Sequence, residues 1–191
     1  MMPALAPQVI ELERALDAGD VPHAFGGALA LAFHIDEPRG TRDIDINVFV
    51  GPQQARAVFE SLPSGVAWND EDLRQVADNG QVRLFWDDTP VDLFFSTHVF
   101  HEEASLRVER VPFDGITIPV LGATELVVFK AFFDRTKDWA DIEAMVEAED
   151  ADVHRALGWL VDLSGADDHR VARLQALLER KPREDEPRFD P

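Results

Sequence analysis

Cysteine is absent from the 191 residues of the chain, which excludes both a disulfide framework and a thiolate metal site. Long hydrophobic runs are absent as well: the longest, over residues 26–33 and 126–129, are far too short to cross a bilayer. The N-terminal segment lacks a basic start and carries two early glutamates, Glu11 and Glu13, so it does not resemble a secretory signal. We therefore expect a cytoplasmic protein without a membrane partner.

Basic residues are scarce: the chain has 18 Lys and Arg against 37 Asp and Glu, which gives a formal net charge of -19. Nonspecific binding to nucleic acid needs Lys and Arg to displace phosphate counterions, so this surface as a whole should repel a polyanion. A local basic patch could still lie within it, because two of the three lysines, Lys130 and Lys137, stand within eight residues of each other. Chance alone could also place them so.

Hydrophobic residues make up 46% of the chain, enough for a packed interior, and their pattern indicates an α+β (α/β) fold. Segments are expected over residues 8–16 (helix), 22–25 (strand), 28–35 (helix), 43–50 (strand) and 53–62 (helix). Two strand pairs follow, over 81–86 with 90–95 and over 106–111 with 115–120, with turns at 87–89 and 114–115. This order predicts a sheet with helices on one face.

The chain after residue 122 predicts only helices, over 123–133, 138–148, 153–163 and 169–180. The last eleven residues are charged and proline-rich, which is typical of a disordered tail. We therefore divide the chain into a core domain of residues 1–121, a helical part of residues 122–180 packed on that core, and a disordered tail of residues 181–191.

Two aspartates, Asp43 and Asp45, stand at the start of a strongly predicted strand. Side chains two apart in a strand project from the same face, so the pair offers two oxygen ligands of the kind that magnesium prefers. Asp92 lies inside a later apolar strand, where a carboxylate is costly unless it is paired or bound to metal. If the two strands are neighbours, the three carboxylates form one metal site; otherwise each is a solvated acid near a strand end.

Gly26 and Gly27 stand between a predicted strand and a predicted helix. Backbone NH groups at the start of a helix can contact a phosphate, and the lack of side chains lets the phosphate come close. A tight turn is the alternative interpretation of this pair.

The stretch HAFGGALALAFHIDEPRGTRDIDINVFV resembles the opening motif of the nucleotidyltransferase superfamily, and is most similar to the branch of minimal nucleotidyltransferases and abortive-infection (AbiEii-like) toxins. The match places Gly26, Gly27, Asp43, Asp45 and Asp92 on family positions, with Arg39 and Thr41 in the loop before the carboxylates. A second stretch, LVVFKAFFDRTKDWADIEAM, resembles the AbiEii-like pattern at Lys130, Arg135, Lys137, Asp138 and Asp141.

The resemblance implies a nucleotidyltransferase-like mixed sheet and transfer of a nucleoside monophosphate from a triphosphate to a hydroxyl, with Mg²⁺ or Mn²⁺. Asp43, Asp45 and Asp92 would be the metal ligands, and Asp92 also the base. Lys130, with Arg39, Arg42 or Lys137, would offset the charge of the triphosphate. Asp138 and Asp141 share a helix face and would orient Lys130 or Lys137, unless this is an ordinary amphipathic helix with solvated charge pairs.

Three hypotheses for the acceptor and role stay open. The AbiEii-like resemblance implies tRNA or a protein as acceptor, in a toxin–antitoxin or phage-defence system with a cognate antitoxin or toxin. A transferase for small molecules such as aminoglycosides or lincosamides is the second. The third is a binding protein that keeps the fold without catalysis. His98 and His101 are not expected to bind metal, because the loop predicted around them would not hold the pair in place.

Overall fold

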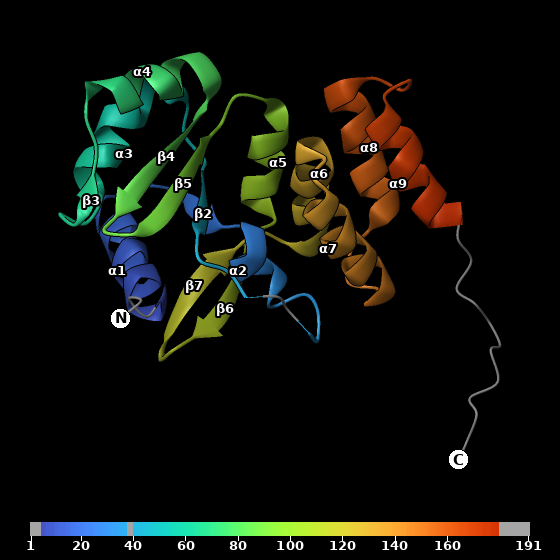
Figure 1. Cartoon of the computed structure of the whole chain (residues 1–191), viewed down its shortest axis with the longest axis horizontal. Helices are drawn as coiled ribbons and strands as arrows, with labels where there is room; N and C mark the ends of the chain where they lie inside the picture. Colours follow the sequence, from blue (N-terminus) through green and yellow to red (C-terminus); the bar gives the residue numbers. More distant parts are fainter. Residues whose placement is uncertain (1–4, 38–39, 180–191) are drawn as a thin grey trace.

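Seven strands form one sheet in the computed structural model, which describes residues 5–37 and 40–179 (Figure 1). Their order across the sheet is β3-β4-β5-β2-β1-β7-β6. The bounds are β1 His23–Phe25, β2 Ile44–Val48, β3 Val66–Ala67, β4 Gln81–Trp86, β5 Thr89–Phe95, β6 Glu109–Phe113 and β7 Ile116–Val120. Strand β2 runs parallel to β5 and β1 parallel to β7, while the other pairs are antiparallel. The predicted mixed sheet and the α+β class are confirmed.

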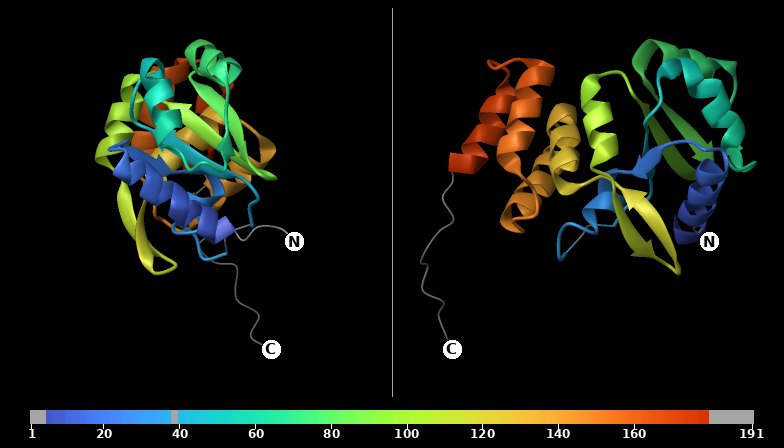
Figure 2. Two further views of the ribbon diagram at one scale, coloured as in Figure 1. Left: turned by 90° about the vertical axis from the view of Figure 1, so that its left-hand side faces the viewer. Right: turned by 180° about the vertical axis from the view of Figure 1, so that it is seen from behind.

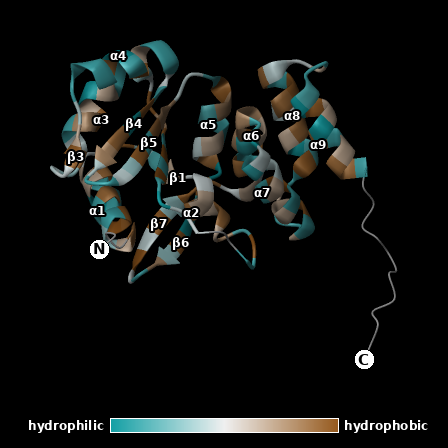
Figure 3. Cartoon of the chain, in the orientation of Figure 1, coloured by the Kyte–Doolittle hydropathy of each residue, from teal (hydrophilic) through white to brown (hydrophobic). Residues whose placement is uncertain are grey.

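The helices precede, interrupt and follow the strands. Their bounds are α1 Leu5–Ala18, α2 Gly27–Leu31, η1 Pro52–Gln54 (a 3-10 turn), α3 Ala55–Ser61, α4 Asp70–Asn79, α5 Val99–Leu106, α6 Ala123–Phe133, α7 Thr136–Glu147, α8 Val153–Ser164 and α9 His169–Glu179. The helix expected over residues 28–35 ends early, at Leu31. The last four helices are found close to their expected positions, and hydrophobic and hydrophilic residues alternate along α8 and α9 (Figure 3).

Helices α4 and α5 and the short strand β3 were not expected from the sequence. In α4 only Val76 is buried, and a capping box between Asn69 and Asp72 starts the helix. Helix α5 occupies the segment predicted as a loop around two histidines. The side chain of His98 accepts a hydrogen bond from the backbone NH of Phe100 and so caps this helix.

One face of the sheet is fully packed. Alternate residues of β2, β4 and β5 are buried on it: Ile44, Ile46, Val48, Val82, Leu84, Val91, Leu93 and Phe95. Helix α3 covers this face through Phe59, whose ring centroid lies 6.4 Å from that of Phe95. Helix α1 does so through Gln8, whose side-chain oxygen accepts a hydrogen bond of 2.8 Å from Thr89. The residues between the buried ones, among them Asp45 and Asp92, therefore point to the opposite face.

Helices α6 to α9 pack together at one end of the sheet, next to α5 (Figures 1 and 2). The ring of Phe100 in α5 lies 5.1 Å from Phe129 of α6 and 5.3 Å from Trp159 of α8. Helix α6 also contacts α2 and borders a cavity with Asn47 of β2, so helices cover part of the second face too, contrary to the expectation of one covered face. In the described part of the chain, no helix is long and apolar enough to cross a membrane.

The division into a core of residues 1–121 and a helical part of residues 122–180 stays a prediction, and the tail of residues 181–191 lies outside the described residues. A direct link between the two parts is His34, which is buried after α2. Its Nε2 donates to the carbonyl of Leu121 at 2.8 Å, and its Nδ1 lies 2.6 Å from the carboxylate of Asp150. His34 therefore connects the loop after α2 to the chain before α6 and before α8.

Replacing His34 by Ala should lower the free energy of unfolding by about 1–3 kcal/mol, because the buried Leu121 carbonyl loses its donor. Urea denaturation would measure this change. The matched control is His154→Ala, since His154 is exposed on α8 and its loss should cost less than about 0.5 kcal/mol. Equal effects of the two substitutions would show that the His34 contacts do not hold the helices to the sheet.

Candidate active site

Three carboxylates meet on the open face of the sheet. Asp43 directly precedes β2, Asp45 lies in β2 and Asp92 in β5. The parallel register pairs Asp45 with Asp92, and one ligand atom from each of the three residues lies within 4.8 Å of the others. A divalent ion of the Mg²⁺ or Mn²⁺ type suits this set, because all of its donors are carboxylate oxygens.

The electrostatics of the cluster also fit a cation. Burial, followed by the charges of Asp43 and Asp92, raises the pKa of Asp45 from 3.8 to about 6. Burial also acts against ionisation of Asp43, but the hydroxyl of Thr41 donates to its carboxylate and, with the charge of Lys137, holds the Asp43 pKa below its usual value. The cluster thus carries repulsion that a bound divalent ion would relieve.

The glycine pair lies against the same cluster. Gly27 starts α2 with a φ of 54°, and a Cβ atom placed on it would lie 1.8 Å from Oδ2 of Asp45. The backbone NH of Gly26 donates to the carbonyl of Asp45 at 2.8 Å. A residue with a side chain at position 27 would displace the Asp45 carboxylate, so the glycine is required for this approach. The Gly26 NH is therefore engaged within the sheet and does not face a phosphate as expected, whereas contact of the Gly27 NH with phosphate stays a prediction.

Two of the predicted basic residues, Lys130 of α6 and Arg135 directly before α7, form ion pairs with aspartates of α7. Lys130 is only 4% exposed, and its Nζ lies 2.6 Å from the Asp141 carboxylate. Asp138 is fully buried and pairs with Arg135 at 2.6 Å, instead of orienting a lysine as expected. Lys130 and Arg135 border the cavity that Asp45 and Gly27 also line, so both positive charges lie beside the carboxylates.

The loop before β2 and the first turn of α7 supply the remaining predicted residues. Thr41 contacts Asp43 as described, while Arg42 and Lys137 are exposed. Lys137 is close enough for its charge to act on Asp43. Arg39 lies outside the described residues.

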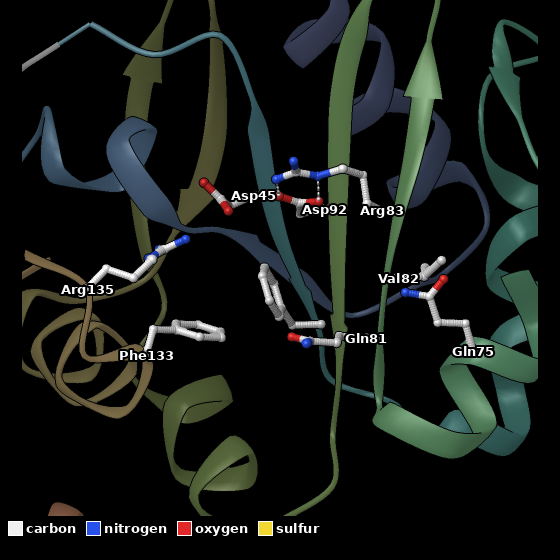
Figure 4. Close-up of a pocket in the computed structure, with 9 residues that line it drawn as sticks. Asp45, Gln75, Gln81, Val82, Arg83, Asp92, Phe133 and Arg135 are labelled. Atoms are coloured by element: carbon white, nitrogen blue, oxygen red, sulfur yellow. Dashed lines mark hydrogen bonds and ion pairs between the residues drawn. The ribbon is translucent and has the colours of Figure 1, made fainter. Parts of the chain in front are cut away.

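A cleft of about 310 Å³ opens beside the cluster (Figure 4). Its lining joins two of the carboxylates to arginine, amide and aromatic side chains from α4, β4, β5 and the end of α6: Asp45, Gln75, Gln81, Val82, Arg83, Asp92, Phe94, Phe133 and Arg135. The rings of Phe94 and Phe133 lie 5.5 Å apart, and the Arg135 guanidinium lies 5.3 Å from the centre of the Phe133 ring. The cleft therefore offers cations and flat apolar surfaces next to the candidate metal ligands.

Arg83 contacts one of the three carboxylates and was not predicted from the sequence. It lies opposite Asp92 in the β4–β5 hairpin and donates two hydrogen bonds to that carboxylate, of 2.7 and 2.6 Å. The length of the turn decides which residue of β4 faces Asp92. Thr89 belongs to β5, so the turn consists of the two residues Asp87 and Asp88. A turn over 87–89 would have placed Leu84 opposite Asp92, because a shift of one residue changes every pair.

No described protein family and no curated protein matches the chain by sequence. Its structure resembles that of ANT(2'')-Ia in complex with adenylyl-2''-tobramycin, with a TM-score of 0.58 and 10% identity over 90% of this chain and 97% of the other. It also resembles the lincomycin-bound lincosamide antibiotic adenylyltransferase LnuA (TM-score 0.52, 13% identity, 74% of this chain and 96% of that one). An antigenic nucleotidyltransferase-like protein from Paracoccidioides brasiliensis gives a TM-score of 0.52 at 16% identity, over 93% of both chains.

The chain has the nucleotidyltransferase fold. The resemblance noted in the sequence is thereby confirmed at the level of the fold, whereas its AbiEii-like branch stays a hypothesis. Within this nucleotidyltransferase fold, the aspartates of β2 and β5 lie together at the edge of the cleft, and the start of α2 lies against Asp45.

Replacing Gly27 by Ala should abolish stabilisation of this nucleotidyltransferase fold by Mn²⁺, because the added Cβ collides with Asp45. Gly115→Ala is the matched control: Gly115 also has a positive φ, of 86°, but nothing lies within 4 Å of an added Cβ. Both variants should lose about 1–2 kcal/mol of stability from the left-handed backbone. Only Gly27→Ala should lose the rise in Tm with Mn²⁺, and a preserved rise would refute the glycine's role.

Without divalent metal, Asp45→Asn should stabilise the protein by at least about 1 kcal/mol above pH 6, since it removes a half-buried charge that Asp43 and Asp92 repel. The pH window follows from the raised pKa. Between pH 3.8 and about 6 the unfolded state loses the Asp45 proton while the folded state retains it, so the wild type loses stability as pH rises. Thermal denaturation in EDTA at pH 4 and pH 7.5 would measure the difference in stability between Asp45→Asn and the wild type, which should be small at pH 4. A variant less stable than wild type at pH 7.5 would contradict this.

Proposed function

We propose that this chain is a metal-dependent nucleotidyltransferase, which moves a nucleoside monophosphate from a triphosphate to an acceptor hydroxyl. The observation that carries the proposal is the meeting of Asp43, Asp45 and Asp92 beside Gly27, within the nucleotidyltransferase fold. A binding protein without catalysis would have no use for three mutually repelling carboxylates at the edge of an open cleft.

The three aspartates have two roles in this reaction. Asp43, Asp45 and Asp92 would hold Mg²⁺ or Mn²⁺, and the bound ion would supply positive charge that polarises the phosphates. Asp92 accepts the proton of the acceptor hydroxyl. The oxygen of that hydroxyl bonds to the α-phosphorus while the bond between the α-phosphorus and pyrophosphate breaks.

The groups around the carboxylates position the triphosphate. The backbone NH of Gly27 contacts a phosphate, and the charge that develops on the leaving pyrophosphate is offset by nearby basic side chains. We assign this last role to Lys130, Lys137, Arg42 and Arg39.

For the acceptor, we propose first a small neutral or cationic molecule with a hydroxyl. The net charge of -19 opposes an extended RNA, and the cleft of about 310 Å³ is of the size that a small molecule fills. The similar structures of ANT(2'')-Ia and LnuA hold an adenylylated tobramycin and lincomycin, which is the same class of ligand. A tRNA end or a protein in a toxin–antitoxin system, implied by the AbiEii-like resemblance, is the second candidate.

The test is transfer of label from each of the four α-labelled triphosphates, with Mg²⁺, to a panel of aminoglycosides and lincosamides or to tRNA. Changing Asp43 and Asp45 together to Asn should lower turnover at least about 1000-fold, because the metal ligands are lost. Changing Asp87 and Asp88 to Asn is the control, since it removes the same charge from the β4–β5 turn and should leave turnover within about twofold.

Two outcomes would contradict the proposal. Turnover that survives the loss of Asp43 and Asp45 would show that the carboxylates are not the site. If no acceptor is labelled and no triphosphate stabilises the protein in the presence of Mg²⁺, the chain is a binding protein that retains the fold.

A further inference from the structure

Arg83 holds both oxygens of one of the three carboxylates. Its Nε donates to Oδ1 of Asp92 at 2.7 Å and its Nη2 to Oδ2 at 2.6 Å, so the guanidinium engages the carboxylate as a planar fork (Figure 4). Asp92 is also one of the three residues whose oxygens lie close enough to share a metal ion. One carboxylate therefore has two prospective cationic partners.

The two side chains of this ion pair differ in solvent exposure. The side chain of Asp92 is 13% exposed and lies in a central strand, whereas that of Arg83 is 52% exposed and reaches it from the cleft. The strand neighbours of Arg83, Val82 and Leu84, are each 2% exposed on the packed face and hold its backbone in place. The guanidinium can therefore leave Asp92 by rotation of its own side chain, without disturbing the core.

The negative charge around Arg83 favours its pairing with Asp92 in the protein without ligands. The hydrogen bonds to Asp92 and the charges of Asp92, Asp43 and Asp45 raise the pKa of Arg83 above its ordinary value. Asp45, at the centre of the cluster, is repelled by both of the other carboxylates. The positive charge of Arg83 thus reduces the repulsion among the three carboxylates.

We propose that Arg83 is a resident counter-ion of Asp92, which a divalent metal ion displaces, and that the freed guanidinium then binds the phosphates of the nucleotide. This inference rests on the proposed function, because it requires the metal site. The released group stays in the cleft, which it lines together with Asp45 and Arg135. A guanidinium matches phosphate oxygens with the same two-pronged geometry that it uses on a carboxylate.

A purely structural role makes the opposite prediction. If the ion pair serves to hold Asp92 in position for the metal, its loss loosens a ligand and weakens metal binding. If Arg83 competes with the metal, its loss leaves Asp92 available and strengthens metal binding. The sign of the change in metal affinity therefore separates the two roles.

The first experiment is titration of the full chain with Mn²⁺, followed by electron paramagnetic resonance of the free ion. Arg83→Gln should lower the Kd for Mn²⁺ about fivefold or more, and Arg83→Lys, which keeps the charge but not the fork, should lower it less. Arg110→Gln is the matched control, because Arg110 also lies in a strand, β6, but borders a different cavity that none of the three aspartates lines. It should leave the Kd unchanged.

The second experiment measures the affinity for ATP at saturating Mn²⁺. Here Arg83→Gln should raise the Kd about tenfold, because a charge-assisted contact with phosphate is lost. The inference requires both changes together. A weaker or unchanged affinity for Mn²⁺, or an unchanged affinity for ATP, would overturn it.

Asp45→Asn distinguishes this inference from the proposed function. If the wild type binds Mn²⁺, Asp45→Asn does not, and Arg83→Gln equals the wild type, the metal site stands and only the role of Arg83 is wrong. If Asp45→Asn binds Mn²⁺ as the wild type does, the bound ion is not at the aspartates, and the proposed function fails together with the inference.

Discussion

The parallel pairing of β2 with β5 is the constraint on which the rest of the structure depends. It sets Asp45 beside Asp92 and, through the alternation of side chains, sends Ile44 and Ile46 into the packed face. The same register that builds the core therefore assembles the carboxylates on the opposite side. A slip of one residue would bury the acids and expose the core residues, so fold and site cannot vary independently.

The second wall of the site comes from the helices that follow the sheet. Helix α6 contacts α2 and brings Lys130 beside the cavity that Asp45 and Gly27 line. Arg135 lies between this helix and α7, and each of the two cations is paired with a buried aspartate of α7. An acidic chain can thus keep positive charge next to its carboxylates, because the cations are locally neutralised and fixed in place.

The three carboxylates are held together although their charges repel one another. Asp45 is half-buried between two like charges, and Gly27 adopts a left-handed backbone that lets the Asp45 carboxylate come close. Both features cost stability in the protein alone, which is the pattern expected where a cation and a charged ligand complete the structure. The pairing of Arg83 with Asp92 offsets part of that cost.

Local features were within reach of the sequence. The alternation around Asp43 and Asp45 placed both on one strand face, and the helical periodicity after residue 122 predicted α6 to α9, because each depends on neighbours a few residues away. Helix α4 was missed but was also within reach, because the capping box between Asn69 and Asp72 that starts it is itself a local signal. Only the tertiary structure decided that β5 lies beside β2 and that Arg83 faces Asp92. These contacts depend on strand order and on a one-residue difference in a turn, and the pattern of nearby residues does not encode them.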